Sequence, residues 1–532
     1  MHSQPEHEQD IPVLTDDHAT TTPLDRRRFL QVGAAAGAAV VAADLLSPLG
    51  ALAAPPRLST KPYTINFFPG GAGTYGPATP TKANPHPPTA LKNLADAYHK
   101  LHPNITINFI PNNVGNAFGS AQEGTFAWLT AQAAAGRAPD VTWSQWISVN
   151  AGFFPQGLFI DLKPYFQRPN RYVPGNKRWI DLMNPSVIEA ITASHGEIYL
   201  VDCDYVATGI YYNTALWQKA GAGAPPTSWA EFLNVHKKMK AKGITPVGFA
   251  LTSAVVPSWW ERQASSQLFQ EEAKAINVTH DSFIISATDY AVGIKKGVFS
   301  MKNPRYAEIW TLLKEWSQYW VPGSSAINFG NGGGTGLNDL TLLIQGRCGM
   351  VWEGSWAGIE LDQQGFKGKW GVFPFPLITK ATTPYATGIH VGDVVGGPNA
   401  AYQYFVPSHK GNNSLTTDKL AWIMDWLQYI STPQHVDDMV NENPQYVPTV
   451  KGTHPANKTL ASLVPVGKPG LSISGIFNDF LGPKATQSAV EMLQSYINGS
   501  YSDKTFASKF EDLLQTSVDA WAKQNKINLS KY

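Results

Sequence analysis

The sequence predicts an α/β protein that is divided into two lobes. The chain has 532 residues, which is too long for one small hydrophobic core and fits two lobes with a tail. Beyond the N-terminal region, segments with strand periodicity alternate with segments of helical periodicity, which is typical of a doubly wound α/β sheet. Apolar residues make up 43% of the chain and charged residues 15%, as expected of a globular protein.

The first predicted lobe opens with five elements in the order strand, helix, strand, helix, strand. Tyr63–Phe68 alternates and is rich in β-forming residues, and Ala90–His102 has apolar residues at helical spacing. Ile105–Ile110 alternates again, Phe126–Ala135 has the pattern of a helix, and Asp140–Trp143 begins a third strand. In sheets of this kind ligands bind at the carboxyl ends of the strands.

The rest of the chain continues the mixed pattern. It predicts a turn into a strand at His195–Tyr199 and a strand at Gly209–Asn213. A helix begins within Pro225–Phe232, because Glu231 follows Ser228 by three residues and completes a capping box. Four later segments have helical spacing: Pro304–Trp320, Thr417–Ile430, Ser488–Asn498 and Thr505–Gln524. Two Gly-containing segments are linker candidates: Pro322–Gly334 and Gly392–Asn399.

The charge balance and the cysteine content exclude several classes of function. Lys plus Arg total 41 and Asp plus Glu total 40, so the chain lacks the basic surplus that nucleic-acid binding needs. The two cysteines, Cys203 and Cys348, are too few for a disulfide scaffold or a Cys-based zinc site. They form either one disulfide or two buried thiols. The sequence contains no His-Glu-x-x-His, Gly-x-Ser-x-Gly or Walker motif, so we expect no cofactor, no metal site and no enzyme activity.

The first 53 residues have the pattern of a disordered N-terminus followed by an export signal. A basic segment, Asp25–Leu30, precedes the Ala-rich apolar run Val32–Leu46, and Ala51–Ala53 is a small-residue cleavage pattern. The order Arg-Arg-x-Phe-Leu, read at Arg26 and Arg27, resembles a twin-arginine signal.

Other interpretations of this segment are a transmembrane anchor or a buried helix. The apolar run is shorter than the roughly 20 residues that a spanning helix needs. No cysteine lies near the cleavage pattern, so we expect an exported protein without a lipid anchor, in the periplasm or outside the cytoplasmic membrane. Whether the signal is cut or retained stays open.

Eight short motifs follow one another in the mature chain at plausible spacing. They are Tyr98–Ile105, Ala134–Val141, Gly157–Leu162, Gly196–Tyr199, Tyr211–Asn213, Pro225–Phe232, Gly346–Met350 and Gly354–Trp356. Each motif alone is weak, but the ordered series resembles the extracellular solute-binding proteins of ABC importers, family 1, the maltose-binding type.

The resemblance implies a type II periplasmic-binding fold, in which two α/β lobes are joined by crossing strands and close by a hinge. It places the crossings near Asp202–Tyr205, Val391–Gly397 and Ser431. The implied first lobe contains residues 60–203 and 396–431, and the implied second lobe contains residues 204–395 and 432–532.

The resemblance also implies the function. A protein of this family captures a carbohydrate between its lobes and delivers it to the permease subunits of an ABC transporter, usually as a monomer. A sugar offers apolar C–H faces, on which aromatic rings stack, and hydroxyl groups, which carboxylates and amides bind. We therefore expect aromatic and polar side chains at the site.

Trp356 is the first candidate for the sugar site, because it matches the Trp of the family's Gly-x-Trp motif, and Glu353 supplies a carboxylate beside it. Trp143, Trp146 and Gln145 follow the third strand at its carboxyl end, where one of the two tryptophans is expected to face the ligand. A core position is the alternative for each tryptophan, because most tryptophans of a large protein are buried.

A second group of candidates lies at the predicted crossings and on the second lobe. Asp202, Asp204 and Tyr205 occupy the first crossing, where buried carboxylates need ligand hydroxyls, a cation, backbone amides or a lysine as partners. Of the neighbours Trp259 and Trp260, one is expected in the core and one facing the ligand. The remaining candidate is Asp393, beside two glycines of the second crossing.

Two rival functions remain open from the sequence. An exported glycoside hydrolase needs two carboxylates that flank one bond, and Glu353 with Asp204 is a conceivable pair. A binding protein for a non-sugar solute is the other rival. A phosphate-bearing ligand would require clustered Arg or Lys, whereas the candidate segments are aromatic and acidic, which favours a neutral or weakly cationic solute.

Overall fold

A computed structural model describes most of the chain after residue 57. The described residues are 58–70, 75–77, 87–111, 121–143, 157–193, 196–280, 285–330, 337–389, 402–442, 444–454, 456–457, 463, 471–478 and 480–532. The predicted export signal, the second predicted crossing, and Gln145, Trp146 and Asp393 lie outside these residues. No described helix is long and apolar enough to cross a membrane.

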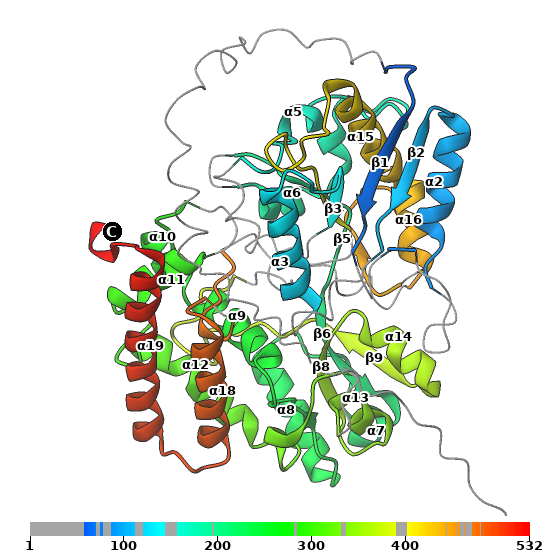
Figure 1. Cartoon of the computed structure of the whole chain (residues 1–532). Helices are drawn as coiled ribbons and strands as arrows, with labels where there is room; N and C mark the ends of the chain where they lie inside the picture. The colour runs from blue at the N-terminus through cyan, green and yellow to red at the C-terminus, as the bar shows by residue number, and fades with distance from the viewer. Residues whose placement is uncertain are drawn as a thin grey trace, which may run out of the picture. The chain divides into compact units, whose positions relative to one another are not determined.

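The first sheet has five strands in the order β2-β1-β3-β10-β4, and its strands β1, β2 and β3 are labelled in Figure 1. Its strands are β1 (Tyr63–Phe68), β2 (Ile105–Phe109), β3 (Val141–Trp143), β4 (Leu200–Asp202) and β10 (Gln403–Phe405). β1 runs parallel to β2 and β3, whereas β10 runs antiparallel to β3 and β4. Among the helices of this part are α2 (Ala90–Leu101), α3 (Ala121–Ala134), α15 (Thr417–Ile430) and α16 (Pro433–Glu442). Their buried side chains and the strands form what we call the first core.

Asp140, the acid of the Ala134–Val141 motif, fixes this sheet to α15. Its carboxylate lies 2.7 Å from Lys419 Nζ and accepts hydrogen bonds from the backbone N–H of Asn66 (2.7 Å) and from Asn412 Nδ2 (2.8 Å). Asp140 is 1% exposed and the Lys419 side chain 10%. A buried charge needs such complete pairing. The Asp of this motif therefore stabilises the fold.

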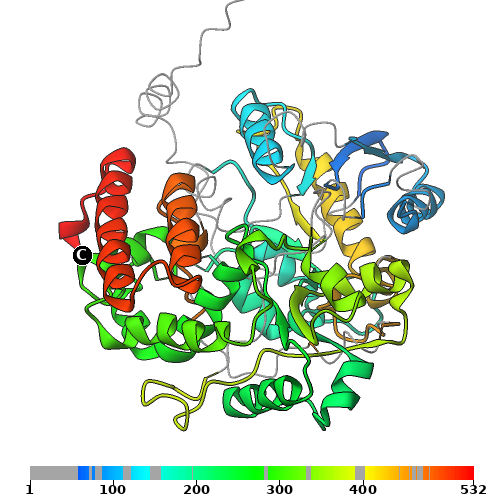
Figure 2. The ribbon, with the colours of Figure 1, turned by 90° about the horizontal axis from the view of Figure 1, so that it is seen from below.

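The second sheet has four strands in the order β7-β8-β6-β9. They are β6 (Thr208–Asn213), β7 (Val247–Gly248), β8 (Met350–Gly354) and β9 (Trp370–Phe373). The helices of its surroundings include α7 (Thr214–Ala220), α8 (Trp229–Ala241), α9 (Val255–Leu268), α10 (Gln270–Ile276), α11 (Ala287–Lys295), α12 (Pro304–Ser317), α13 (Asp339–Ile344) and α14 (Ala357–Leu361). Two C-terminal helices, α18 (Pro483–Ile497) and α19 (Asp503–Asn525), lie side by side in Figures 1 and 2 and pack on this second core. The short helices α5 (Lys163–Phe166) and α6 (Pro185–Ile191) belong to the first part.

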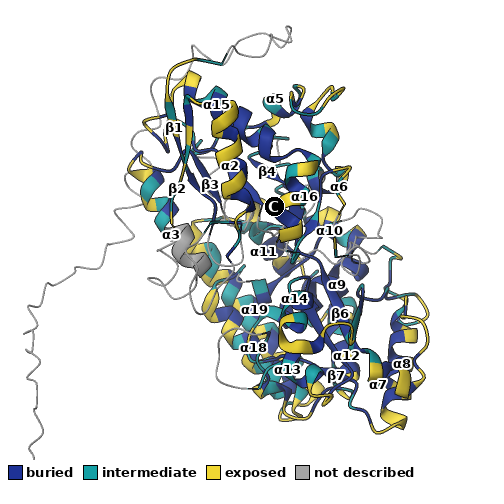
Figure 3. Cartoon of the chain, turned by 90° about the vertical axis from the view of Figure 1, so that its right-hand side faces the viewer, coloured by how far each residue is buried: buried dark blue, intermediate teal, exposed yellow. Residues whose placement is uncertain are grey.

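Burial follows the two cores, with buried residues on the strands and exposed residues on the outer helical faces (Figure 3). Helix α9 is an exception, because every residue from Val256 to Leu268 is buried. Its polar side chains bind backbone groups instead of water: Ile473 N–H donates to Ser266 Oγ, and Ile378 N–H donates to Gln267 Oε1. A helix without a solvent face has no amphipathic pattern, which explains why it was not predicted.

Two crossing segments pair with each other. β5 (Asp204–Tyr205) runs antiparallel to β11 (Val447–Pro448). Ser431, the predicted third crossing, accepts a hydrogen bond from Trp179 Nε1 and lies within the first part, and the first core also contains the later residues Val440 and Val450. The exact bounds of the lobes stay a prediction.

Most predicted elements are present. β1 and α15 have the predicted bounds, and the capping box of Ser228 and Glu231 begins α8 as expected. α3 and α18 begin earlier than predicted. The strand expected to end at Tyr199 was displaced: Ile198 forms only a bridge to Thr192, and the ladder with β10 begins at Leu200.

Candidate functional site

The carboxyl group of Glu353 is buried at the end of β8. Glu353 pairs with Gly209 of β6 and is fully buried. Its Oε2 accepts the N–H of Gly354 at 3.3 Å, whereas Oε1 has no hydrogen-bond donor. A buried acceptor without a donor is costly. The groups around Oε1 therefore decide whether this carboxyl is protonated or ionised.

Asp339, the first residue of α13, faces Glu353. Asn338 caps this helix, and Asp339 Oδ1 accepts the N–H groups of Gly330 (2.9 Å) and Leu340 (2.8 Å). Its Oδ2 has no donor, and the carboxyl groups of Asp339 and Glu353 are within hydrogen-bonding reach of each other. Two facing carboxyls are stable only when one holds a proton.

Burial raises the pKa of both acids. The pKa of Asp339 rises to about 7, with burial as the main cause and its two N–H donors opposing the shift. The pKa of Glu353 rises well above its usual range because of burial, then the charges of Asp339 and Glu360. No ion pair of the described residues includes Asp339 or Glu353. The described residues also contain no cluster of three or more metal-ligating side chains.

Three aromatic rings lie beside this pair, and we call Trp259, Phe329 and Trp356 the aromatic wall. The ring centroids of Trp259 and Phe329 are 5.1 Å apart with an interplanar angle of 86°, and those of Phe329 and Trp356 are 6.2 Å apart at 89°. Trp259 is buried, whereas Phe329 and Trp356 are half-buried. The wall therefore keeps apolar ring surface accessible, as stacking on a sugar face requires.

The Gly-x-Trp motif has a steric explanation. Trp356 immediately precedes α14, and its indole folds back onto Gly354, the last residue of β8. A Cβ atom at Gly354 would overlap this ring. Only glycine permits this position of Trp356, so the motif fixes one ring of the aromatic wall.

Ser355, the residue between Gly354 and Trp356, hydrogen-bonds to both crossing segments. Ser355 N–H donates to Ala207 O at 2.8 Å, between β5 and β6, and Ser355 Oγ donates to Gln445 O, just before β11. The end of β8, with Glu353 and Trp356, therefore lies against both described crossing segments.

The two acids of the first crossing are satisfied by the protein itself. Asp204 accepts from Tyr75 Oη (2.6 Å) and from Tyr402 N–H (2.9 Å), and Asp202 accepts from Gln403 Nε2 (3.2 Å) and Asp204 N–H. Burial, followed by the charge of Asp204, raises the pKa of Asp202 well above its usual range. Among the alternatives for these acids, neutral donors of the chain are the observed partners. Tyr205 is buried beside them.

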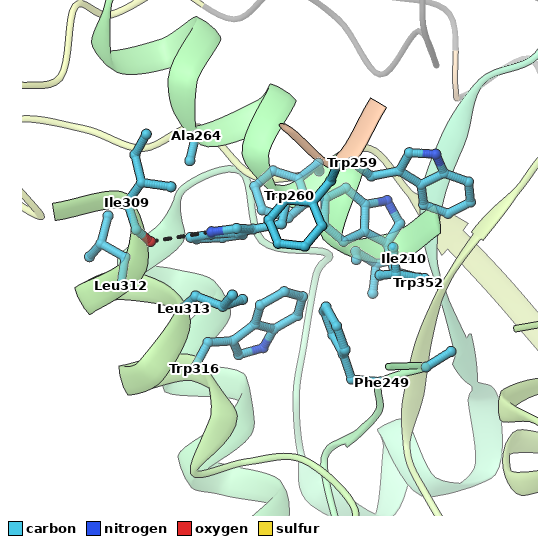
Figure 4. Close-up of a cluster of buried hydrophobic side chains, with 14 of the residues drawn as sticks. Ile210, Phe249, Trp259, Trp260, Ala264, Ile309, Leu312, Leu313, Trp316 and Trp352 are labelled. Carbon is cyan, nitrogen blue, oxygen red and sulfur yellow. Dashed lines mark hydrogen bonds between the residues drawn. The ribbon is translucent and has the colours of Figure 1, made fainter. Parts of the chain in front are cut away.

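The structure distinguishes Trp259 from Trp260. Trp260 is fully buried, donates from Nε1 to Ile309 O at 3.2 Å and packs against Trp316 (Figure 4). It also packs against Trp229. Trp259 belongs to the aromatic wall instead and contacts Phe329 and Trp356. Trp143 is 6% exposed in the first core, opposite Tyr404 of β10.

Sequence reasoning missed Asp339 and Phe329. Phe329 is an aromatic residue at the start of a Gly-rich stretch, and Asp339 follows a capping asparagine. Each is a weak signal alone, because only the fold brings them to Glu353 and Trp356. Both cysteines are unpaired and buried, Cys203 in the first core and Cys348 in the second.

Known proteins resemble this chain in sequence and in fold. A family model described as bacterial extracellular solute-binding protein matches residues 82–436. The multiple sugar-binding protein of Streptococcus mutans serotype c (strain ATCC 700610 / UA159) is 27% identical over 182 residues, which are 34% of this chain and 39% of that protein. The chain therefore matches less than half the length of this curated relative.

Two solved structures illustrate the likeness of fold. A probable secreted solute-binding lipoprotein from Streptomyces coelicolor aligns with a TM-score of 0.60 at 15% identity, over 86% of this chain and 99% of that one. A cyclic alpha-maltosyl-1,6-maltose binding protein from Arthrobacter globiformis aligns with a TM-score of 0.54 at 15% identity, over 86% and 99%. These alignments confirm the predicted α/β fold of the two-lobe type.

Proposed function

Because the chain belongs to the family of bacterial extracellular solute-binding proteins, we propose that it captures a carbohydrate between its lobes and delivers it to the permease of an ABC importer. The observation that carries this proposal is the aromatic wall beside the carboxyls at the end of β8. Half-buried aromatic rings suit the C–H faces of a sugar, and acids that pair with no Arg or Lys among the described residues disfavour a phosphate-bearing solute.

The known ligands of two similar proteins, as their names state them, support a sugar as the ligand class. The Streptococcus mutans relative is named a multiple sugar-binding protein, and the Arthrobacter globiformis protein binds cyclic alpha-maltosyl-1,6-maltose. The ligand of this chain remains our proposal, since the first match is partial and the second is a likeness of fold.

We assign different roles to the predicted site residues. Trp356 and Phe329 are proposed to stack on the sugar, with Trp259 supporting them. Trp143, Trp146, Gln145 and Asp393 are proposed contributors from the other side of the site. Asp202 and Asp204 are proposed to hold the crossing rather than the ligand, because tyrosine, glutamine and backbone donors already occupy them.

The setting of this function is also proposed. Arg26 and Arg27 would direct export by the twin-arginine route, without a lipid anchor. The exported protein would act as a monomer, without nucleic acid or cofactor, and would bind without catalysis. The lobes would close on the ligand by a hinge at the paired crossings β5 and β11.

A melting-temperature screen of the exported protein tests the proposal. A ligand that binds only the folded state raises the melting temperature by mass action. We expect a shift with at least one mono- or oligosaccharide and none with inorganic phosphate. If no saccharide shifts the melting temperature, carbohydrate is the wrong ligand class. Release of new reducing ends from an oligosaccharide would instead show a glycoside hydrolase.

A further inference from the structure

The Asp339–Glu353 pair is buried behind the aromatic wall and contains two acceptor atoms without a donor. Glu353 Oε1 and Asp339 Oδ2 both lack a hydrogen-bond donor in the structure, although the two carboxyl groups are within hydrogen-bonding reach. Two ionised carboxylates at this separation repel each other strongly, because little water screens them. One proton between the two oxygens gives Asp339 Oδ2 a donor, turns Glu353 Oε1 into that donor, and removes one of the two negative charges.

The position of that proton follows from the other contacts. Asp339 Oδ1 already accepts two backbone N–H groups, at 2.9 and 2.8 Å, and these favour the ionised form of Asp339. Glu353 accepts only the longer bond from Gly354 N–H. Glu353 is therefore the acid that carries the proton and donates it to Asp339 Oδ2.

The pair is connected mechanically to one ring of the aromatic wall. The N–H of Gly330 that Asp339 accepts belongs to the residue directly after Phe329. Glu353 Oε1 lies 3.4 Å from the place where a Cβ at Gly330 would be, so Glu353 packs against the same glycine. The backbone of Asn328 is also joined to Leu337 and Asp339, at the start of α13. The carboxyl pair and these bonds hold the backbone that carries Phe329.

We propose that the Asp339–Glu353 pair shares one proton that holds Phe329 in the aromatic wall, so that ligand affinity falls when alkaline solution removes this proton. Asp339 is thus a positioning residue, which acts on the ligand through Gly330 and Phe329. The effect on affinity rests on the proposed function, whereas the shared proton does not.

The titratable groups around the pair give no compensation for a second negative charge. Glu360 of α14 adds a negative charge that Glu353 senses. Burial raises the pKa of Tyr211 on β6 and that of Cys348 before β8, so both stay neutral. The charge of Arg347 lowers the pKa of Cys348, but among the described residues Arg347 forms no ion pair with Asp339 or Glu353. Loss of the proton is therefore relieved only by separation of the carboxyls or by entry of water, and either change displaces Gly330.

Glu353→Gln is the decisive variant, because a glutamine amide donates to Asp339 at any pH. With the saccharide selected by the melting screen, we expect the wild-type dissociation constant to rise about tenfold between about pH 6.5 and about pH 9.5. The Glu353→Gln protein should keep its affinity within about twofold over the same range. Asp339→Asn, whose amide donates to Glu353, is the second variant and should also be flat.

Glu261→Gln is the matched control. Glu261 is another buried glutamate of the same lobe, with a pKa raised to about 7 mainly by burial, and it bonds Phe477 N–H rather than Gly330. This variant should follow the wild-type pH profile. The inference is wrong if wild type is flat, or if Glu353→Gln and Asp339→Asn both retain the wild-type rise.

A measurement without ligand separates this inference from the proposed function. Amide hydrogen exchange of the Phe329–Gly330 peptide, compared at each pH with that of Glu353→Gln, should show loss of protection in wild type only at alkaline pH. If this loss occurs but no saccharide binds, the shared proton stands and the proposed function fails. If a saccharide binds and exchange is the same in both proteins at every pH, the inference fails and the proposed function stands.

Discussion

Two buried acidic sites of this chain are built in opposite ways. In the first core, Asp140 contacts a lysine and two hydrogen-bond donors, so its charge is fully compensated. In the second core, Asp339 and Glu353 face each other, and no Lys or Arg in the described part of the chain forms an ion pair with either. Both sites are buried, and each joins an α-helix to a sheet: Lys419 of α15 contacts Asp140 before β3, and Asp339 of α13 faces Glu353 of β8.

The two sites show that burial alone does not distinguish an acid that stabilises the fold from an acid that serves the ligand site. Asp140 stabilises the fold through its ion pair with Lys419, whereas Asp339 binds the N–H of Gly330, next to Phe329 of the aromatic wall. An uncompensated acidic pair is costly for stability, and such groups concentrate at functional sites. The pattern of partners, rather than the degree of burial, separates the structural acid from the positioning pair.

The largest expected effect comes from breaking the compensated site. Lys419→Met leaves Asp140 buried without its cation and should lower the free energy of unfolding by about 3 to 5 kcal/mol. Denaturant unfolding measures this loss, and saccharide affinity of the folded protein should be unchanged. The double variant Asp140→Asn/Lys419→Met should recover much of the loss. A single variant as stable as wild type would mean that the ion pair contributes nothing.

The uncompensated site should show itself in the pH dependence of stability. Glu353 carries the shared proton, and Asp339 binds a further one with a folded pKa of about 7, above its ordinary value of 3.8, so the folded state holds this second proton more tightly than the unfolded state. Its stabilisation is full below about pH 4 and is lost as the pH rises to about 7. Relative to Asp339→Asn, wild type should lose about 4 kcal/mol over this range. A constant difference between the two proteins would contradict the raised pKa.

Removing one ring of the aromatic wall should affect binding more than folding. Trp356→Ala should weaken saccharide binding by about tenfold to a hundredfold, equivalent to about 1.5 to 3 kcal/mol, because the sugar loses its stacking surface. Trp521→Ala is the control, since Trp521 is also half-buried but lies on α19. Calorimetric titration compares the two. Equal losses of affinity would remove Trp356 from the site.

The smallest effect is expected at an acid with neutral partners. Tyr75→Phe removes the 2.6 Å hydrogen bond to Asp204 and should cost about 1 to 2 kcal/mol of unfolding free energy. In the kind of partner it has, Asp204 lies between the other two acids: it binds neutral donors, whereas Asp140 pairs with a lysine and Asp339 faces a second acid. Denaturant midpoints measure it, and a loss as large as that of Lys419→Met would show that Tyr75 is indispensable to the crossing.

The sequence predicts this fold well where residues are periodic and poorly where burial is complete. β1, α15 and the capping box of α8 have strong local patterns and were predicted correctly. Helix α9 has no solvent face, so its residues show no amphipathic period.

The candidate site was predicted in part. Trp356 and Glu353 were found because the Gly-x-Trp motif is local, and its steric cause is the contact of Trp356 with Gly354. Asp339 and Phe329 reach the site only through the fold, so no local pattern marks them. Neighbours such as Trp259 and Trp260 look equivalent in sequence, and only their three-dimensional contacts assign one to the wall and the other to the core.

The central claim is that a carbohydrate binds at the aromatic wall. A crystal structure of the exported protein with the saccharide selected by the melting screen tests it most directly. We predict a sugar ring stacked on Trp356 and near Phe329, with Trp260 still bonded to Ile309 and Asp204 still bonded to Tyr75. A saccharide bound elsewhere, with the aromatic wall empty, would contradict the account.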